Sequence, residues 1–332
     1  MQIEFACTSC PLIVMARILK IFTSHTHSLG LIRLHYFKGE KHKYTLSVNK
    51  KMSPFLIYRG GKREERSPEG LIMTISMENK LGEGSMVARP ISNIVFIIAM
   101  QTEALPLVNK FELTEDPNSL FPKNVPWVRY NGKYKDLNVN IVCPGKDAIL
   151  GVDSVGTVSA ALLTYASIQA LKPDLIINAG TAGAFKAKGA SIGDVYLASD
   201  VAFHDRRIPI PVFDLYGVGL RQACCTPNVI KALNLKVGKL STGDSLDMCP
   251  LDEASIMKND AVIKDMEGAA VAYVADLLKV SVIFLKAVTD IVDGDKPTAE
   301  EFLQNLAAVT AALDEAATKV VDFINGKCLS EL

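Results

Sequence analysis

The sequence has no apolar run long enough to cross a membrane and no excess of charge of either sign. None of its stretches approaches the roughly 18 uninterrupted apolar residues of a membrane-spanning helix. Its 36 basic and 36 acidic residues balance within a chain of 332. Nucleic acid is therefore not expected as the main partner, because neutralising phosphates needs a clustered basic surface. Arg17 and Lys20 interrupt the early apolar residues, which argues against a secretory signal.

The cysteines are few, and their spacing indicates no disulfide framework. There are seven cysteines, an odd number, and Cys7 and Cys10 form a lone C-x-x-C pair. A second pair or a histidine at zinc-finger spacing is missing, so we expect no zinc site. The pattern indicates reduced, mostly structural thiols, as in a cytoplasmic protein.

Several loops that bind cofactors or carry nucleophiles are also missing. The sequence contains no G-x-G-x-x-G, no G-x-x-x-x-G-K-[ST] and no G-x-S-x-G. Dinucleotide-binding, P-loop and serine hydrolase functions are therefore disfavoured. His204 and Asp205 are adjacent, but without a serine nucleophile elbow we interpret His204 as a structural histidine.

Charge is distributed unevenly along the chain. Residues 1–63 carry eleven Lys or Arg against two acids, whereas residues 81–332 carry 23 basic and 30 acidic residues. Four of the five histidines also lie in the basic part. Residues 62–66 and 82–85 are interpreted as solvated linker.

This break predicts two parts, an N-terminal extension over residues 1–88 and a catalytic domain over residues 89–328. The extension fits three descriptions: an organelle transit segment, a disordered tail, or an over-extended reading frame whose true start is Met77. We favour the last two together.

From residue 91 the pattern is that of an α/β domain. Strand-like runs alternate with helical ones, which predicts a layered sheet covered on both faces. The expected strands are 94–99, 138–142, 175–178, 194–198, 201–203, 235–240 and 282–288, and the expected helices are 103–110, 158–169, one near 227, 267–278 and one from 298.

Three details of this pattern are specific enough to test. Strand 175–178 is expected to end in a glycine loop at 179–183. The helix over 158–169 carries an apolar stripe formed by Val158, Ala161, Leu162 and Tyr165. The last helix begins with Thr298 and Glu301 at capping-box spacing.

Polar side chains follow several of the expected strands. They are Glu103, Thr181, Asp244, Glu267 and Asp290. Ligands of such sheets bind outside the carboxyl ends of the strands, so these residues can converge on one pocket. For Glu103 and Glu267 a purely structural role is also open, because carboxylates in a first helical turn often cap the helix.

Five segments in this order resemble a known family: residues 99–103, 176–183, 241–245, 264–268 and 286–290. They resemble the plant 5'-methylthioadenosine nucleosidases of the nucleoside phosphorylase/uridine phosphorylase family, over about residues 89–332. The resemblance implies a three-layer αβα sandwich with a mixed central sheet. It also implies a homodimer and no cofactor.

The implied activity is hydrolysis of the N-ribosidic bond of 5'-methylthioadenosine, a small-molecule nucleoside, to adenine and 5-methylthioribose in methionine salvage. Whether S-adenosylhomocysteine is also a substrate stays open. Asn178 stands where related phosphorylases have a phosphate-binding arginine, which favours water over phosphate as the nucleophile. A phosphate-dependent phosphorylase and a non-catalytic storage protein of the same family are the alternatives.

The resemblance also implies a role for each matching residue. Glu103 is expected to activate water and Asp290 to protonate the adenine at N7. The substrate-binding residues are expected to be Thr181, Leu246, Lys264, Asp265, Met266 and Glu267, with Glu267 on the ribose hydroxyls and Met266 beside the sugar.

Hydrolysis of an N-ribosidic bond needs two groups of the kind expected at Asp290 and Glu103. Adenine leaves poorly as an anion, so an acid must deliver a proton as the bond breaks. A desolvated pocket can keep an aspartic acid protonated near neutral pH. A second carboxylate can activate the water or stabilise the cationic sugar carbon.

Overall fold

The computed structural model describes residues 89–117 and 120–332, together with the backbone of five short strands before them. The chain divides into two compact units, Met1–Ser85 and Met86–Leu332. The strands of the first unit form a three-stranded antiparallel sheet and a separate hairpin: β1 (Arg33–Lys38), β2 (Tyr44–Asn49) and β5 (Met73–Met77), then β3 (Ile57–Arg59) and β4 (Lys62–Glu64). The sequence analysis did not find them, and it was wrong to include residues 62–64 in a linker. The expected linker at 82–85 lies outside the described residues.

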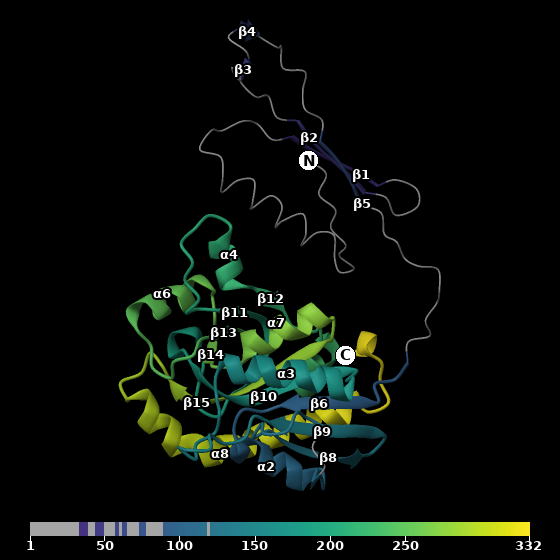
Figure 1. The fold of residues 1–332 in the computed structure, drawn as a ribbon, viewed down its shortest axis with the longest axis vertical. Coiled ribbons are helices and arrows are strands. Elements are labelled where there is room, and N and C mark those ends of the chain that lie inside the picture. The colour runs from purple at the N-terminus through teal and green to yellow at the C-terminus, as the bar shows by residue number, and fades with distance from the viewer. Residues whose placement is uncertain are drawn as a thin grey trace. The chain divides into compact units, whose positions relative to one another are not determined.

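A ten-stranded mixed sheet forms the centre of the second unit (Figure 1). Its strands are β6 (Asn93–Ile97), β7 (Thr114–Glu115), β8 (Val128–Tyr134), β9 (Leu137–Cys143), β10 (Leu175–Ala184), β11 (Val195–Phe203), β12 (Arg221–Gln222), β13 (Lys236–Thr242), β14 (Ile263–Asp265) and β15 (Val282–Ile291). Strand β10 is central: it pairs parallel with β6 and β15 and antiparallel with β14. The expected mixed sheet is confirmed.

Helices cover both faces of this sheet. They are α2 (Gln101–Lys110), α3 (Thr157–Leu171), α4 (Phe213–Val218), α5 (Pro227–Leu233), α6 (Pro250–Lys258), α7 (Gly268–Leu278) and α8 (Thr298–Ile324). Figure 1 shows α3 and α7 on one side of the sheet and α2 and α8 on the other. Among the described residues, no helix combines the length and apolar character needed to cross a bilayer.

The alternation of side chains along β6 explains the three layers. Ile94 and Phe96 pack into the core that α2 and α8 complete, whereas Val95 and Ile97 pack into the core of α3 and α7. Successive side chains of a strand point to opposite faces, so a strand that is apolar throughout requires cover on both. The expected αβα sandwich is confirmed.

Two expected strand boundaries are wrong. The glycine-containing segment 179–183 is not a loop, because β10 continues through it to Ala184. The two strands expected over 194–203 are one, β11, with a register irregularity between Ala198 and Val201. In both cases the neighbouring strands supply hydrogen-bond partners for residues that have weak strand propensity on their own.

The start of α8 also differs from the expected capping box. Pro297 is the N-cap, and Thr298 is the first helical residue. The carboxylate of Glu301 instead accepts a hydrogen bond of 2.7 Å from the backbone N–H of Ile291. Glu301 therefore ties α8 to the end of β15.

The apolar stripe expected on α3 does not face the sheet. Val158, Leu162 and Tyr165 are 70%, 57% and 52% exposed. The buried face of α3 is formed by Ala160, Leu163, Thr164, Ser167 and Ile168. Three of the four stripe residues are thus left on the surface of the single chain, whereas Ala161 packs against the core.

Candidate active site

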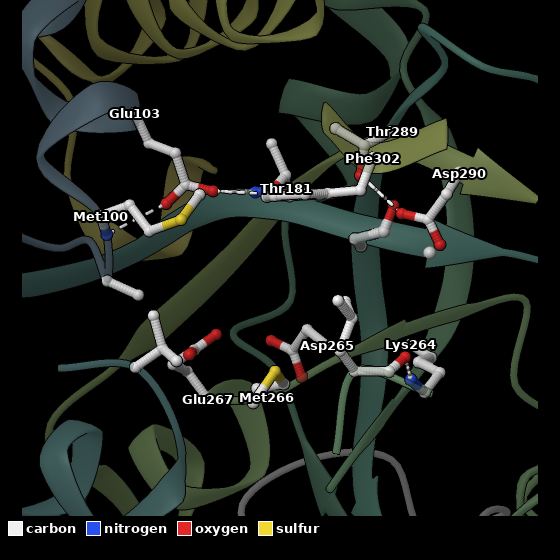
Figure 2. Close-up of a pocket in the computed structure, with 15 residues that line it drawn as sticks. Met100, Glu103, Thr181, Lys264, Asp265, Met266, Glu267, Thr289, Asp290 and Phe302 are labelled. Atoms are coloured by element: carbon white, nitrogen blue, oxygen red, sulfur yellow. Dashed lines mark hydrogen bonds between the residues drawn. The ribbon is translucent and has the colours of Figure 1, made fainter. Parts of the chain in front are cut away.

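A cavity of about 240 Å³ lies at the end of the central strands, and every site residue that the family resemblance implied lines it. Those residues are Glu103, Thr181, Leu246, Lys264, Asp265, Met266, Glu267 and Asp290. Figure 2 shows Glu103 and Asp290 toward opposite ends of the cavity, with Thr181 between them. The sequence analysis missed the rest of the lining, which is Ala99, Met100, Val155, Ala182, Gly183, Thr289 and Phe302.

Glu103 is held by three hydrogen bonds at the start of α2. Its Oε1 accepts from the backbone N–H and the hydroxyl of Thr181, at 2.7 and 2.6 Å. Its Oε2 accepts from the backbone N–H of Met100 at 3.3 Å. Burial raises the pKa of Glu103, and the hydrogen bonds from Thr181 and the charge of Lys286 oppose that shift. Because a carboxylate offers about four acceptor positions, Glu103 both caps its helix and can still accept from a water molecule.

Glu267 is the N-cap residue of α7. Its Oε1 accepts a hydrogen bond of 2.9 Å from the N–H of Gly156, which precedes α3. Burial, together with the charge of Asp265, raises the pKa of Glu267 to about 7. Near neutral pH this carboxyl can therefore be either a hydrogen-bond donor or an acceptor.

The side chain of Asp265 is held by three groups of the protein. It accepts from the hydroxyl of Thr242 at 2.6 Å and from the N–H of Gly268 at 2.9 Å. Lys286, from the middle of β15, lies 2.8 Å from Asp265 Oδ2, and both side chains are only 1% exposed.

Asp290 lies near the end of β15 beside Gly183 of β10. A register shift between Ala182 and Gly183 precedes their pairing, and such irregularities re-aim side chains. The hydroxyl of Thr289 is 2.8 Å from Asp290 Oδ1, which leaves Oδ2 toward Gly183. Burial raises the pKa of Asp290, opposed by the Thr289 hydrogen bond and the charge of Lys264.

Asp244 does not line the cavity, although it follows a strand as expected. It accepts from the N–H and the hydroxyl of Thr157 at the start of α3, at 2.6 and 2.5 Å. Its own N–H donates to Asp205 at 2.7 Å. Asp244 thus connects the loop after β13 to α3.

His204 has the structural surroundings that we expected for it. It is 3% exposed, and its Nδ1 is 3.3 Å from the hydroxyl of Ser241. Its ring packs so closely on Gly243 that a side chain at position 243 would overlap it. Burial lowers the pKa of His204, so a buried neutral imidazole is favoured.

Asn178 is buried in β10 and is not part of the cavity lining. Its side-chain amide donates a hydrogen bond of 3.0 Å to the backbone carbonyl of Ile97. Among the described lining residues there is no arginine, and Lys264 is the only cation. Among all the residues that the structure describes, no group of three or more His, Cys, Asp or Glu side chains could hold a metal ion.

Comparison with known proteins identifies the family of this chain. The sequence profile described as the Phosphorylase superfamily matches residues 93–324. The chain belongs to this superfamily.

Two curated relatives from Arabidopsis thaliana are similar over nearly their whole length. One, a 5'-methylthioadenosine nucleosidase, is 68% identical over 266 residues, covering 80% of this chain and 100% of the relative. The other, a 5'-methylthioadenosine/S-adenosylhomocysteine nucleosidase, is 70% identical over 249 residues, covering 75% and 98%. The resemblance seen in the sequence is confirmed.

A solved structure supports the same family and the same fold. The apo form of an Arabidopsis thaliana 5'-methylthioadenosine nucleosidase is 72% identical and has a TM-score of 0.73. The comparison covers 74% of this chain and all of that one.

Proposed function

We propose that this protein is an N-glycosyl hydrolase that cleaves 5'-methylthioadenosine to adenine and 5-methylthioribose. The observation that carries the proposal is that Glu103 and Asp290, which lie 187 positions apart in the printed sequence, line one cavity. The names of the Arabidopsis thaliana relatives supply the substrate. The activity belongs to methionine salvage, because it returns the methylthio group from the nucleoside.

Asp290 is proposed as the general acid. A carboxyl whose pKa is raised by burial can still hold a proton when substrate binds near neutral pH. Thr289 occupies Oδ1, so the proton belongs on Oδ2, from which it can pass to N7 of the adenine. Protonation turns the departing base into a neutral leaving group.

Glu103 is proposed as the base that activates water. The two hydrogen bonds from Thr181 and the charge of Lys286 favour its ionised form against the effect of burial. Its position at the far end of the cavity from Asp290 suits attack on the opposite side of the sugar from the leaving base.

The remaining lining residues suit a nucleoside between these two carboxyls. Glu267 is proposed to bind the ribose hydroxyls, and Met266 to lie beside the sugar. Leu246, Thr181 and the backbone at Lys264 and Asp265 are proposed to surround the purine. A mostly apolar cavity with a few convergent polar groups is typical of a small-molecule site.

Hydrolysis is favoured over phosphorolysis by the lining of the cavity. Phosphate recognition commonly relies on arginine, whose forked guanidinium binds two oxygens at once. No described lining residue is an arginine, and Lys264 has its N–H donors directed at backbone carbonyls. Water is therefore the expected nucleophile.

An adenine-release assay tests this function. Purified full-length protein is incubated with 5'-methylthioadenosine with and without inorganic phosphate, and adenine and 5-methylthioribose are quantified. We expect equal release in both. Release that strictly requires phosphate, with the sugar recovered as its 1-phosphate, would establish a phosphorylase. No release from folded protein would favour the storage protein.

Three further features are proposed with this function. Residues 89–328 form the catalytic domain, and residues 1–88 are an extension outside it. The protein acts in the cytoplasm as a homodimer, and S-adenosylhomocysteine is assayed as a second substrate because one relative is named for it.

The exposed apolar stripe of α3 supports the homodimer, since contiguous apolar surface marks protein interfaces. Light scattering of the purified protein measures the assembly directly.

A further inference from the structure

The side chain of Lys264 makes an unusual set of contacts at the purine end of the proposed site. Lys264 lies in the three-residue strand β14 and is 3% exposed. Its ammonium donates to three consecutive backbone carbonyls, those of Ser245, Leu246 and Asp247, at 3.0, 2.6 and 3.2 Å. An ammonium has three N–H donors, so these bonds use all of them.

No carboxylate among the described residues forms an ion pair with Lys264, in contrast to the buried pair of Lys286 and Asp265. An ammonium without a counter-ion is expensive to bury, and burial lowers the pKa of Lys264. The carbonyls of one short loop are its direct hydrogen-bond partners, and the charge of Asp290, followed by those of Asp247, Asp252 and Asp265, opposes the effect of burial.

The loop that Lys264 holds forms part of the cavity wall. It connects β13 to α6, and its residue Leu246 lines the cavity. Asp244 fixes the start of the loop by binding Thr157 of α3. Without Lys264, the contacts described above would hold the loop only at Asp244, through Thr157 and Asp205.

We propose that Lys264 is a positioning residue: its ammonium fixes the backbone of residues 245–247 and thereby holds Leu246 against the purine. This inference rests on the proposed function and extends it, because it assigns a role to the side chain and not to the backbone of Lys264. The charge of Asp290 also acts on this ammonium.

The charge of Lys264 has a second consequence for the acid. A nearby cation stabilises the ionised form of Asp290, so Lys264 limits how far burial raises its pKa. Removing the cation should raise the pKa of Asp290 further. The charged groups that act on these two residues are Asp247, Asp252 and Asp265 around Lys264, and Glu301 of α8 beside Asp290.

Two substitutions separate hydrogen bonding from charge. Lys264→Met removes both, whereas Lys264→Gln removes the charge but keeps two N–H donors on a side chain that is one atom shorter. For Lys264→Met we expect KM for 5'-methylthioadenosine to rise roughly tenfold or more, with a smaller fall in kcat, as for lost charge-assisted hydrogen bonds. The rise should be smaller for Lys264→Gln.

The pH profile provides a readout that a merely structural role would not move. Activity falls on the alkaline side as Asp290 loses its proton. In both variants this limb should move to higher pH, because the cation that lowers the pKa of Asp290 is gone. Lys239→Met is the matched control: Lys239 lies on β13, pairs with Asp260 at 3.1 Å and does not line the cavity. The Lys239→Met variant should change neither KM nor the alkaline limb of the pH profile.

Hydrogen exchange of the amides of residues 245–247, measured without substrate, tests the loop directly. Exchange should be faster in Lys264→Met than in the wild type and the Lys239→Met control. If Lys264→Met does not fold, Lys264→Gln decides. A KM within twofold of wild type together with unchanged exchange in the folded variant would overturn the proposal. If the wild type releases no adenine, the proposed function fails, while exchange still reports on Lys264.

Discussion

The ammonium of Lys286 lies 2.8 Å from the carboxylate of Asp265, a residue of the cavity lining, with 1% of each side chain exposed. Gly180 separates this pair from Glu103: a methyl group built there would lie 3.4 Å from the Glu103 oxygens and 3.5 Å from Lys286 Nζ. One buried cation thus acts on Asp265, Glu103 and Glu267 together.

Lys286→Met should destabilise the protein by about 3–5 kcal/mol, because it leaves Asp265 buried without its partner. Urea unfolding at neutral pH measures the change. The double variant Lys286→Met/Asp265→Asn should recover part of the loss, since it removes the uncompensated charge as well. A single variant as stable as wild type would show that Asp265 does not depend on this pair.

Asp290→Asn should lower kcat by roughly 10²- to 10⁴-fold while changing substrate binding little, because the proton donor is lost and the shape survives. The rate of the wild type should fall as pH rises through the raised pKa of Asp290. Steady-state kinetics across pH measures both. Near-normal turnover in the variant would mean that another group is the acid.

Glu103→Gln should also lower kcat by roughly 10²- to 10⁴-fold, since an amide cannot take a proton from water. The wild-type rate should fall as pH decreases through the pKa of Glu103, which burial raises. The acid limb should therefore lie above the range of an ordinary glutamate. An acid limb that persists unchanged in a still-active Glu103→Gln would assign it to a different residue.

Gly183→Ala should impair catalysis through Asp290. The added methyl would lie 2.6 Å from Asp290 Oδ2 and 2.8 Å from a methyl carbon of Val292, so one of them must move. We expect kcat to fall at least tenfold, since Oδ2 is the oxygen proposed to carry the proton. The control is Gly189→Ala, where the position is open but the backbone φ of 82° adds local strain far from the cavity.

Glu267→Gln should change how stability depends on pH. The folded chain holds the Glu267 proton with a pKa of about 7, against 4.5 for an ordinary glutamate. A raised pKa contributes stability that is present below about 4.5 and lost as pH rises toward 7. Relative to the variant, the wild type should lose about 3 kcal/mol over this interval. Parallel stability curves from pH 4.5 to 7 would rule out the perturbed carboxyl.

The fold and the position of the site could be predicted from sequence for different reasons. Apolar runs such as residues 94–98 can only be satisfied in a sheet that is covered on both sides, and this predicted the layers. The carboxyl ends of such strands predicted where Glu103 and Asp290 would meet. The resemblance to a family added the chemistry that periodicity cannot give.

Other parts depended on tertiary contacts that no local pattern reveals. Residues 179–183 are strand because β15 and β14 pair with them, not because glycine and alanine favour strands. Phe302 of α8 is an apolar residue within a helix, and nothing in the local sequence indicates that it lines the cavity. Lys286 did give a signal, as a lysine inside the otherwise apolar run 282–288, and a charge in such a run calls for a buried partner.

The cavity wall draws on α2 near the start of the domain's sequence and α8 near its end, and on β10, β14 and β15, which lie between them in the sequence. No fragment that lacks either helix could reproduce it. Occupancy is consequently linked to global unfolding: a compound at 100 times its dissociation constant adds about 2.7 kcal/mol to the native state. A melting-temperature screen of nucleosides would therefore rank candidate ligands without any need for turnover.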